Sequence, residues 1–265
     1  MKIGFIGVGN MGGALLRAVL KKNRAEDIYI ADSSREKTDK YSSEYGVKVC
    51  DNTTLARECG CIFLGVKPQM MEKMLVGISG ALAMRTDKPL LITMAAGLGT
   101  GYISSLAGGC DVVRIMPNMA VGAGEGMILV CAAEGTEHGR IETVKELLSC
   151  AGKTDEISES LIDAASALTG CGPAYVCMFV QALADGAVEC GVPRASARMY
   201  ALQTVLGTVK TLEQTGTHPE KLKDDVCSPA GTTIAGVHAL EDGAFRNAVM
   251  NSVTAAYKRT LEMKK

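Results

Sequence analysis

Short apolar runs alternate with amphipathic stretches along the first part of the chain. Residues 28–31, 61–66 and 112–116 are almost wholly apolar, which is typical of parallel strands buried on both faces. Helical periodicity lies between them, as in residues 11–22 and 69–83. This alternation predicts right-handed βαβ crossovers and a doubly wound parallel sheet. Further strands are expected over residues 47–50, 89–93, 126–131 and 153–156, the last at an edge, and further helices over residues 35–45, 101–107 and 137–151.

After about Ser158 the strand signals stop and helical ones replace them. Helices are predicted over residues 173–190, 193–215, 219–225 and 230–241, with Pro229 in a first turn, and Asp242 is expected to cap a final helix. In that helix Phe245, Val249, Val253, Ala256 and Thr260 form a stripe. We therefore expect an α/β protein with a Rossmann-type domain over residues 1–157 and a helical dimerisation domain over residues 158–265. Because the helical faces are mostly apolar, we expect an intertwined homodimer at least.

Composition and charge are those of an ordinary globular protein. Of the 265 residues, 47% are apolar and 22% are charged, and the net charge of −1 gives no footprint for nucleic acid or an anionic membrane. Charges are expected to interrupt every apolar segment before 18 residues, so no membrane-spanning helix is predicted. Because Met1-Lys2 runs directly into a strand, no signal peptide is expected either, and the predicted location is the cytoplasm.

The ten cysteines are scattered, without a C-x-x-C pair, and there are only three histidines. A zinc or iron–sulfur site is therefore not expected, and neither are disulfides in a reducing compartment. Most cysteines are interpreted as small core residues.

The N-terminus carries a glycine motif with a defined physical role. Gly7, Gly9 and Gly12 have the spacing G-x-G-x-x-G between a strand and a helix, and Asp32 follows about 20 residues later. The first glycine allows a tight turn, the second lets the backbone approach a pyrophosphate, and the third lets the helix pack close to the strand. Free N–H groups at the helix start then face the phosphates. The motif predicts a bound dinucleotide.

The segment after the second predicted strand gives conflicting signals on which dinucleotide binds. An acid such as Asp32 usually bonds the ribose 2′-hydroxyl and favours NAD. The hydroxyls of Ser33 and Ser34 and the guanidinium of Arg35 suit a 2′-phosphate instead. Alternatively, Ser34 is a helix N-cap and has no role in binding the cofactor.

Three further segments lie at the carboxyl ends of predicted strands, at the same edge of the sheet. Doubly wound sheets bind ligands at this edge. They are residues 65–68, 94–97 and 114–118. Ala95 and Ala96 leave room for a flat ring, whereas Lys67 can be a surface lysine and Arg114 a structural ion-pair partner.

In the second half, glycine-bearing polar segments precede two apolar helices, over residues 167–175 and 223–233. Thr232 and Thr233 fall in a first helical turn, where hydroxyls and free N–H groups can hold a carboxylate. Simple N-capping is the alternative.

At this point the sequence resembles the pyrroline-5-carboxylate reductases over essentially its whole length. The most specific segments are residues 4–12, 66–68, 95–97, 114–118, 169–175 and 218–234, the last containing Cys-Ser-Pro-Ala-Gly-Thr-Thr-Ile. The resemblance implies hydride transfer from NAD(P)H, with NADPH favoured and NADH possible, to the C=N bond of 1-pyrroline-5-carboxylate, giving L-proline. It also implies a homodimer, in some members assembled into a decamer of five dimers.

The resemblance carries site residues over one by one. Together with the motifs above, the expected cofactor site comprises Ile6, Gly7, Gly9, Asn10, Met11, Gly12, Asp32, Ser33, Ser34, Arg35, Asn52, Val66, Lys67, Pro68, Ala95 and Ala96. Gly231, Thr232 and Thr233 are expected to hold the substrate carboxylate from the partner subunit, and Thr169 to lie close to the imine nitrogen. Thr169 and Thr233 are the expected catalytic residues, and no metal is required.

Two departures from the family pattern affect these expectations. Ala230 replaces a common glycine, which costs about 1 kcal/mol if the position needs a positive φ and nothing in a helical first turn. Cys171 stands where a serine is frequent, so it is not counted as catalytic.

Two rival functions compete with the reductase. A β-hydroxyacid dehydrogenase needs a lysine early in the second domain, and no lysine occurs between Lys153 and Lys210. A non-catalytic dinucleotide sensor with a helical dimerisation domain would not need both the Thr169 segment and the Thr232-Thr233 helix start.

Overall fold

The computed structural model describes residues 1–263, which form two compact units. The first unit contains residues 1–171 together with the described end of the chain from Tyr257, and the second contains residues 172–256.

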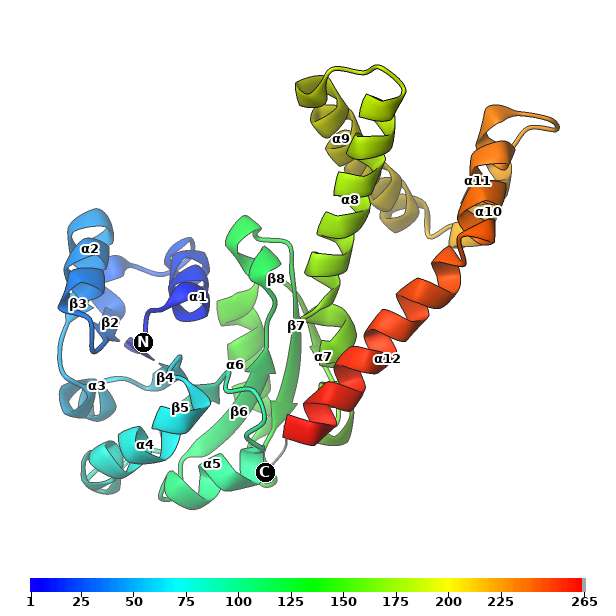
Figure 1. The fold of residues 1–265 in the computed structure, drawn as a ribbon. Helices are drawn as coiled ribbons and strands as arrows, with labels where there is room; N and C mark the ends of the chain where they lie inside the picture. Colours follow the sequence, from blue (N-terminus) through cyan, green and yellow to red (C-terminus); the bar gives the residue numbers. More distant parts are fainter. Residues whose placement is uncertain (264–265) are drawn as a thin grey trace. The chain divides into compact units, whose positions relative to one another are not determined.

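The first unit is built on one eight-stranded sheet with the order β3-β2-β1-β4-β5-β6-β7-β8 (Figure 1). Its strands are β1 (Ile3–Ile6), β2 (Ile28–Ala31), β3 (Lys48–Val49), β4 (Cys61–Leu64), β5 (Leu90–Thr93), β6 (Asp111–Met116), β7 (Gly126–Ala132) and β8 (Gly152–Glu156). All pairs are parallel except β6 with β7. The register sets Ile3 between Ile28 and Cys61, so the strands from β2 to β6 end at one common edge. The predicted doubly wound sheet and its β8 edge strand are confirmed.

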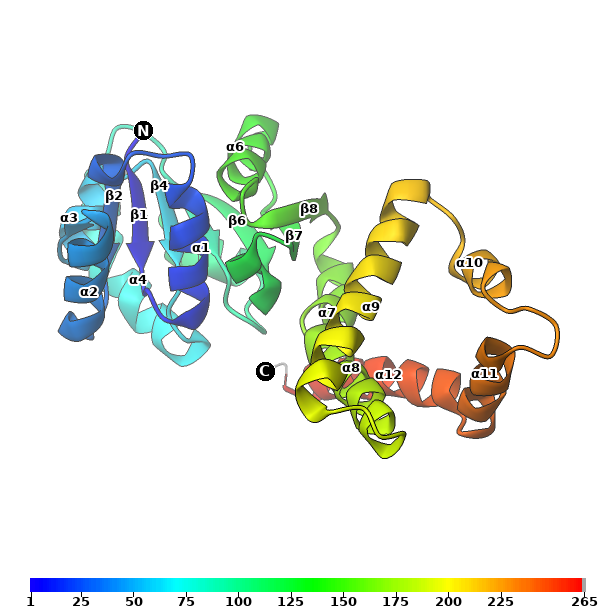
Figure 2. The ribbon, with the colours of Figure 1, turned by 90° about the horizontal axis from the view of Figure 1, so that it is seen from above.

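Helices cover both faces of this sheet (Figure 2). They are α1 (Asn10–Leu20), η1 (Ala25–Asp27), α2 (Arg35–Tyr45), α3 (Asn52–Glu58), α4 (Pro68–Ala83), α5 (Thr100–Leu106), η2 (Met119–Ala123), α6 (His138–Leu148) and α7 (Glu159–Thr169). One core contains the apolar faces of α1 and α6, and a second contains those of α3, α4 and α5. Phe5 of β1 and Phe63 of β4 stack at 4.5 Å between ring centroids, and both rings are fully buried.

Two α-helices of this unit, and the short 3-10 helices η1 and η2, were not among the helices predicted from the sequence. The short helix α3 is capped by Asp51, whose carboxylate accepts hydrogen bonds from the N–H and the hydroxyl of Thr54. Helix α7 packs through the fully buried Ile162 against Leu129 and Cys131 of β7. Helix α7 thus packs on the sheet within the first unit, and the domain boundary expected after residue 157 stays a prediction.

The second unit is helical. It contains α8 (Gly172–Glu189), α9 (Arg194–Thr215), α10 (Pro219–Asp225), α11 (Thr232–Asp242) and the first part of α12 (Phe245–Met263). Helices α8 and α9 pack against each other around Ala184, Ala197 and Ala201, whose small side chains allow a close approach. Phe179 and Phe245 also meet, at 5.8 Å between ring centroids.

Two predictions about helix ends in this unit are wrong. Helix α11 begins at Thr232 rather than at residue 230, because Ser228–Gly231 forms a turn in which the Gly231 N–H donates to the Ser228 carbonyl. Pro229 belongs to this turn and not to a helical first turn. Asp242 is the last residue of α11 and does not cap α12; a residue with positive φ, Ala244, comes directly before α12.

The apolar side chains of the second unit are largely exposed within one chain. Ala184, Ala197 and Ala201 are its buried apolar residues among those described, while Met178, Met199 and Met250 are each more than half exposed. The continuous stretch 159–189 also has the length and mean hydropathy, 1.4, of a possible membrane span. The expectation that charges interrupt every apolar segment before 18 residues is therefore wrong here, because Asp163 and Asp185 have no charged residue between them. Length and composition alone are weak evidence for a span.

Candidate functional site

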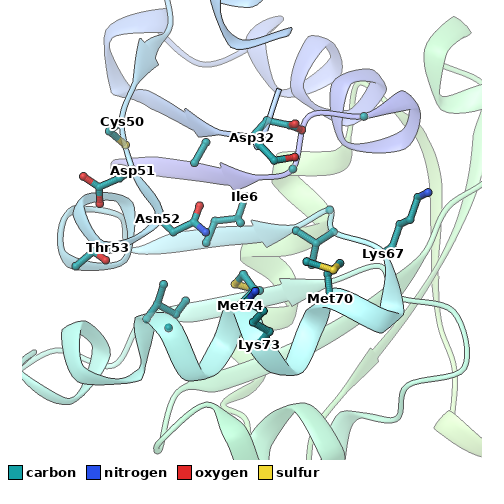
Figure 3. A pocket seen from close by; sticks show the side chains of 18 of the residues that line it. Ile6, Asp32, Cys50, Asp51, Asn52, Thr53, Lys67, Met70, Lys73 and Met74 are labelled. Carbon is teal, nitrogen blue, oxygen red and sulfur yellow. The ribbon is translucent and has the colours of Figure 1, made fainter. Parts of the chain in front are cut away.

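A cavity of about 750 Å³ opens at the carboxyl ends of β1, β2 and β4 (Figure 3). Eight of the sixteen residues expected to bind the cofactor line it: Ile6, Gly7, Gly9, Asp32, Ser33, Asn52, Val66 and Lys67. The start of α3 and one face of α4 complete the wall. The cavity therefore occupies the edge where the sequence predicts a ligand.

The three motif glycines have three different environments. Gly7 has φ +95°, and a Cβ there would lie 2.7 Å from the backbone of Gly65. A Cβ on Gly12 would lie 2.2 Å from the carbonyl oxygen of Gly7, so only glycine lets α1 pack this close to β1. Gly9 has no atom within 4 Å of its Cβ position and lines the cavity as the N-cap of α1, without a side-chain cap. This open space beside the free N–H groups of a helix start fits a pyrophosphate.

Asp32 holds two loops together. One of its carboxylate oxygens accepts from the Val8 N–H at 2.9 Å, and the other accepts from the Ser34 N–H at 2.9 Å. The side chain thus ties the glycine loop to the start of α2. Its role is structural at least, and each oxygen keeps one lone pair for a further donor.

Three lysines, Lys37, Lys67 and Lys73, line the cavity, and Figure 3 shows the last two on either side of Met70. Within residues 1–263, none of the three has a hydrogen bond or ion pair to another side chain. Arg35 does not line the cavity: its side chain is 93% exposed and lies 3.7 Å from Asp39. Lys37, on the first turn of α2, lines the cavity instead, while the role expected for Arg35 stays a prediction.

The other expected cofactor residues lie around the cavity without lining it. These are Asn10, Met11, Gly12, Ser34, Arg35, Pro68, Ala95 and Ala96. Ser34 is the N-cap of α2 and Pro68 the first residue of α4, whereas Ala95 is buried in the core beneath α4 and α5. Sequence reasoning missed Lys37, Cys50, Thr53, Met70, Lys73 and Met74 on the cavity wall. The periodicity of α4 could have indicated Met70, Lys73 and Met74, because residues three and four apart share a helix face.

Arg114 is a structural ion-pair partner, which is the second of the two roles that the sequence left open for it, beside a role at the ligand edge. Its guanidinium is 3% exposed and lies 3.4 Å from Glu159 and 3.3 Å from Asp163 of α7. Glu159 also accepts from the N–H and hydroxyl of Thr100, at 2.6 and 2.7 Å. The buried cation thereby fixes α7 to the sheet.

Thr169 is the last residue of α7. Its Oγ1 is buried and has no hydrogen-bond partner among residues 1–263. Its carbonyl oxygen accepts from Nδ2 of Asn118 at 2.9 Å. Since Asn118 follows the end of β6, Thr169 lies at the carboxyl edge of the sheet, on the side where the cavity opens.

Gly231, Thr232 and Thr233 lie in the second unit, where Gly231 is the N-cap of α11 and makes no side-chain cap bond. Both threonines are exposed and occupy the first turn, whose N–H groups are free to bind an anion. Ala230, just before this turn, has φ +56°, so the alanine occupies a conformation that favours glycine. That Thr169 and these residues of the partner subunit form one substrate site stays a prediction.

The buried thiols are not arranged for chemistry. Burial raises the pKa of Cys59 to about 12 and that of Cys61 to about 11, so both stay protonated near neutral pH. Within residues 1–263, no three His, Cys, Asp or Glu side chains form a group that could hold a metal ion.

Comparison with known proteins agrees with both halves of this description. Residues 159–263 match the family model for pyrroline-5-carboxylate reductase dimerisation, and residues 2–97 match the model for NADP oxidoreductase, coenzyme F420-dependent. The pyrroline-5-carboxylate reductase of Synechocystis is 38% identical over 268 residues, covering 100% of this chain and 99% of that protein. That of Arabidopsis thaliana is 36% identical over 266 residues, covering 99% and 95%.

Solved structures give the same result over the full length. A pyrroline-5-carboxylate reductase from Coxiella burnetii superposes with a TM-score of 0.92 at 28% identity, covering 100% of this chain and 98% of the other. The NADP-bound pyrroline carboxylate reductase of Plasmodium falciparum gives a TM-score of 0.88 at 31% identity, with the same coverage. The chain therefore belongs to the pyrroline-5-carboxylate reductase family.

Proposed function

We propose that this protein reduces the C=N bond of 1-pyrroline-5-carboxylate to give L-proline, with NADPH as the preferred hydride donor. The observation that carries the proposal is the full-length match to pyrroline-5-carboxylate reductases, such as that of Synechocystis at 38% identity, on a chain whose glycine loop opens into a dinucleotide-sized cavity. This reduction is the last reaction of proline synthesis.

The cavity fits the cofactor in shape and in charge. Gly9 and the first turn of α1, with Asn10 and Met11, would hold the pyrophosphate, while Asn52 lies at the adenosine end. The three cavity lysines are without acidic partners among residues 1–263. Their positive charge favours the additional 2′-phosphate of NADPH over NADH. When bound, the nicotinamide supplies the hydride.

The substrate requires little more than positioning, because a protonated cyclic imine is already electrophilic. The buried Thr169 hydroxyl would hold or orient the proton at the imine nitrogen. The first turn of α11, with Gly231, Thr232 and Thr233 of the partner subunit, would bind the substrate carboxylate through its free N–H groups and hydroxyls. Neither role requires a metal.

The assembly proposed for this chain is a homodimer, and larger assemblies would be decamers of five such dimers. The match of residues 159–263 to a dimerisation domain and the exposed apolar faces of α8, α9 and α12 support the dimer. Helix α7 would then belong functionally with residues 158–265, although it packs on the sheet. A partner subunit, and not a lipid bilayer, would cover the apolar stretch 159–189, and the proposed location is the cytoplasm.

The direct test is NADPH oxidation at 340 nm on addition of 1-pyrroline-5-carboxylate, repeated with NADH. Absence of turnover with either cofactor in folded, nucleotide-binding protein would refute the reductase proposal. For the carboxylate site, Thr233→Ala should raise the substrate KM several-fold and leave the NADPH KM within about twofold. Thr143→Ala is the matched control, because that hydroxyl lies on α6 and bonds only the Gly139 carbonyl of its own helix. An unchanged substrate KM in Thr233→Ala would exclude Thr233 from the site.

A further inference from the structure

Asn118 uses both ends of its side-chain amide. Its Oδ1 accepts from the Ala120 N–H at 3.2 Å and so caps the short helix η2, while its Nδ2 donates to the Thr169 carbonyl at 2.9 Å. Asn118 is half-buried and lies two residues after the end of β6. One side chain therefore connects the ligand edge of the sheet to the end of α7.

The opposite end of α7 is already fixed. Glu159 bonds Thr100, and the buried Arg114 pairs with Glu159 and Asp163 one turn further along. The last carbonyls of a helix lack partners inside the helix, so the position of Thr169 depends on what bonds them from outside. The Asn118 amide is the side chain that does so for Thr169 itself.

The hydroxyl of Thr169 has the properties of a ligand-binding group. It is buried and without a hydrogen-bond partner among residues 1–263, and leaving a buried hydroxyl unpaired destabilises the protein. A bound molecule that bonds this oxygen would remove that destabilisation. The hydrogen bond from Asn118 to the Thr169 carbonyl fixes the position of the Thr169 hydroxyl.

We propose that Asn118 is a positioning residue. It holds the Thr169 hydroxyl at the distance from the imine nitrogen that proton transfer requires. The inference rests on the proposed function, in which Thr169 touches the substrate. Asn118 itself does not contact the reacting atoms. Because a misplacement of about 1 Å can reduce a rate about 100-fold, loss of this hydrogen bond should be visible in kcat even in a well-folded protein.

The substitution Asn118→Asp separates the two roles of the side chain. A carboxylate still accepts from the Ala120 N–H, so the cap of η2 is kept. It cannot donate to the Thr169 carbonyl, and it places an oxygen where the donor was. We expect kcat to fall at least tenfold while the Kd for NADPH, measured by calorimetry, stays within twofold. Should this variant fail to fold, Asn118→Ser also keeps an acceptor for the cap and loses the bond to Thr169.

A double-mutant cycle with Thr169→Ala distinguishes positioning from general stability. If Asn118 acts through the hydroxyl, Asn118→Asp should lower kcat at least tenfold in the natural background and less than twofold in the Thr169→Ala background. Equal losses in both backgrounds, or no loss in the first, would overturn the inference. The pH dependence gives a second readout, because the carboxyl group that Asn118→Asp introduces would again donate once it is protonated. The kcat of Asn118→Asp relative to that of Asn118→Ala should therefore rise as the pH falls toward about 4.

The proposed function and this inference fail in different ways. Wild-type protein that binds NADPH but does not reduce 1-pyrroline-5-carboxylate would refute the function, and the inference with it. Active wild-type protein with an equally active Asn118→Asp variant would refute the inference alone.

Discussion

Replacement of Lys37 by methionine should change which cofactor the protein prefers. Lys37 lines the cavity, as Ser33 does, is exposed, and has no side-chain hydrogen bond or ion pair to any residue in 1–263. A 2′-phosphate carries a charge of about −1.5 to −2 near neutral pH. One unit charge at about 4 Å from such a phosphate contributes about 1.5–2 kcal/mol in water, and ordering of an exposed lysine offsets part of that gain. We expect a net loss of about 1.4 kcal/mol, which is a tenfold weaker Kd for NADPH.

The measurement is the Kd for NADPH and for NADH by calorimetry, together with kcat/KM for each cofactor. NADH lacks the 2′-phosphate, so its Kd should stay within about twofold in Lys37→Met. Arg35→Met is the matched control: it removes a cation two residues away whose side chain is 93% exposed and outside the cavity, and it should leave both constants unchanged. Equal weakening of both cofactors, or a selectivity change in Arg35→Met instead, would refute the assignment of the 2′-phosphate to Lys37.

Single contacts give three further predictions. Asp32→Ala should weaken NADPH and NADH together, at least fivefold by calorimetry, because it frees two backbone N–H groups that shape the glycine loop; a selective loss of NADH would place Asp32 on the ribose instead. Ala230→Gly should raise the thermal midpoint by about 1–3 °C, since alanine at φ +56° is strained, and a lower midpoint would contradict this. Hydrogen bonds from Arg246 and Lys223 hold the pKa of Glu220 at about 2, below its ordinary value of 4.5. The stability it contributes is therefore complete above pH 4.5 and lost as the pH falls toward 2, so the midpoints of wild type and Glu220→Gln should converge over that interval.

The sheet was predictable from the sequence because one physical signal determines it. A strand buried on both faces must be apolar at every position, and residues 61–64 and 90–93 are apolar in this way, apart from Thr93 at a strand end. The glycine spacing likewise determines where the pyrophosphate loop lies, because Gly12 packs on the backbone of Gly7 at a distance that no other residue allows.

The sequence favoured Arg35 as the basic cofactor residue, whereas Lys37 is the one of the two that lines the cavity. Arg35 and Lys37 both lie in the first turn of α2, and residues two apart on a helix point to different sides. Sequence proximity to Asp32 favoured Arg35, whereas helix geometry turns Lys37 toward the cavity and Arg35 toward Asp39. A spacing argument that ignores side-chain direction cannot separate the two.

The turn before α11 was not predicted because its residue types fit two different local structures. Proline at residue 229 suits both a helical first turn and the second position of a β-turn, and the sequence does not separate these alternatives. The glycine usual at residue 230 is evidence for the β-turn, but alanine here removes that signal. Because the turn ends at Gly231, the helix starts at Thr232, and both threonines fall in the turn whose N–H groups are unbonded. The strained alanine is thus consistent with a carboxylate site that depends on where the helix begins, and relief of the strain in Ala230→Gly should leave the substrate KM unchanged if the helix start stays in place.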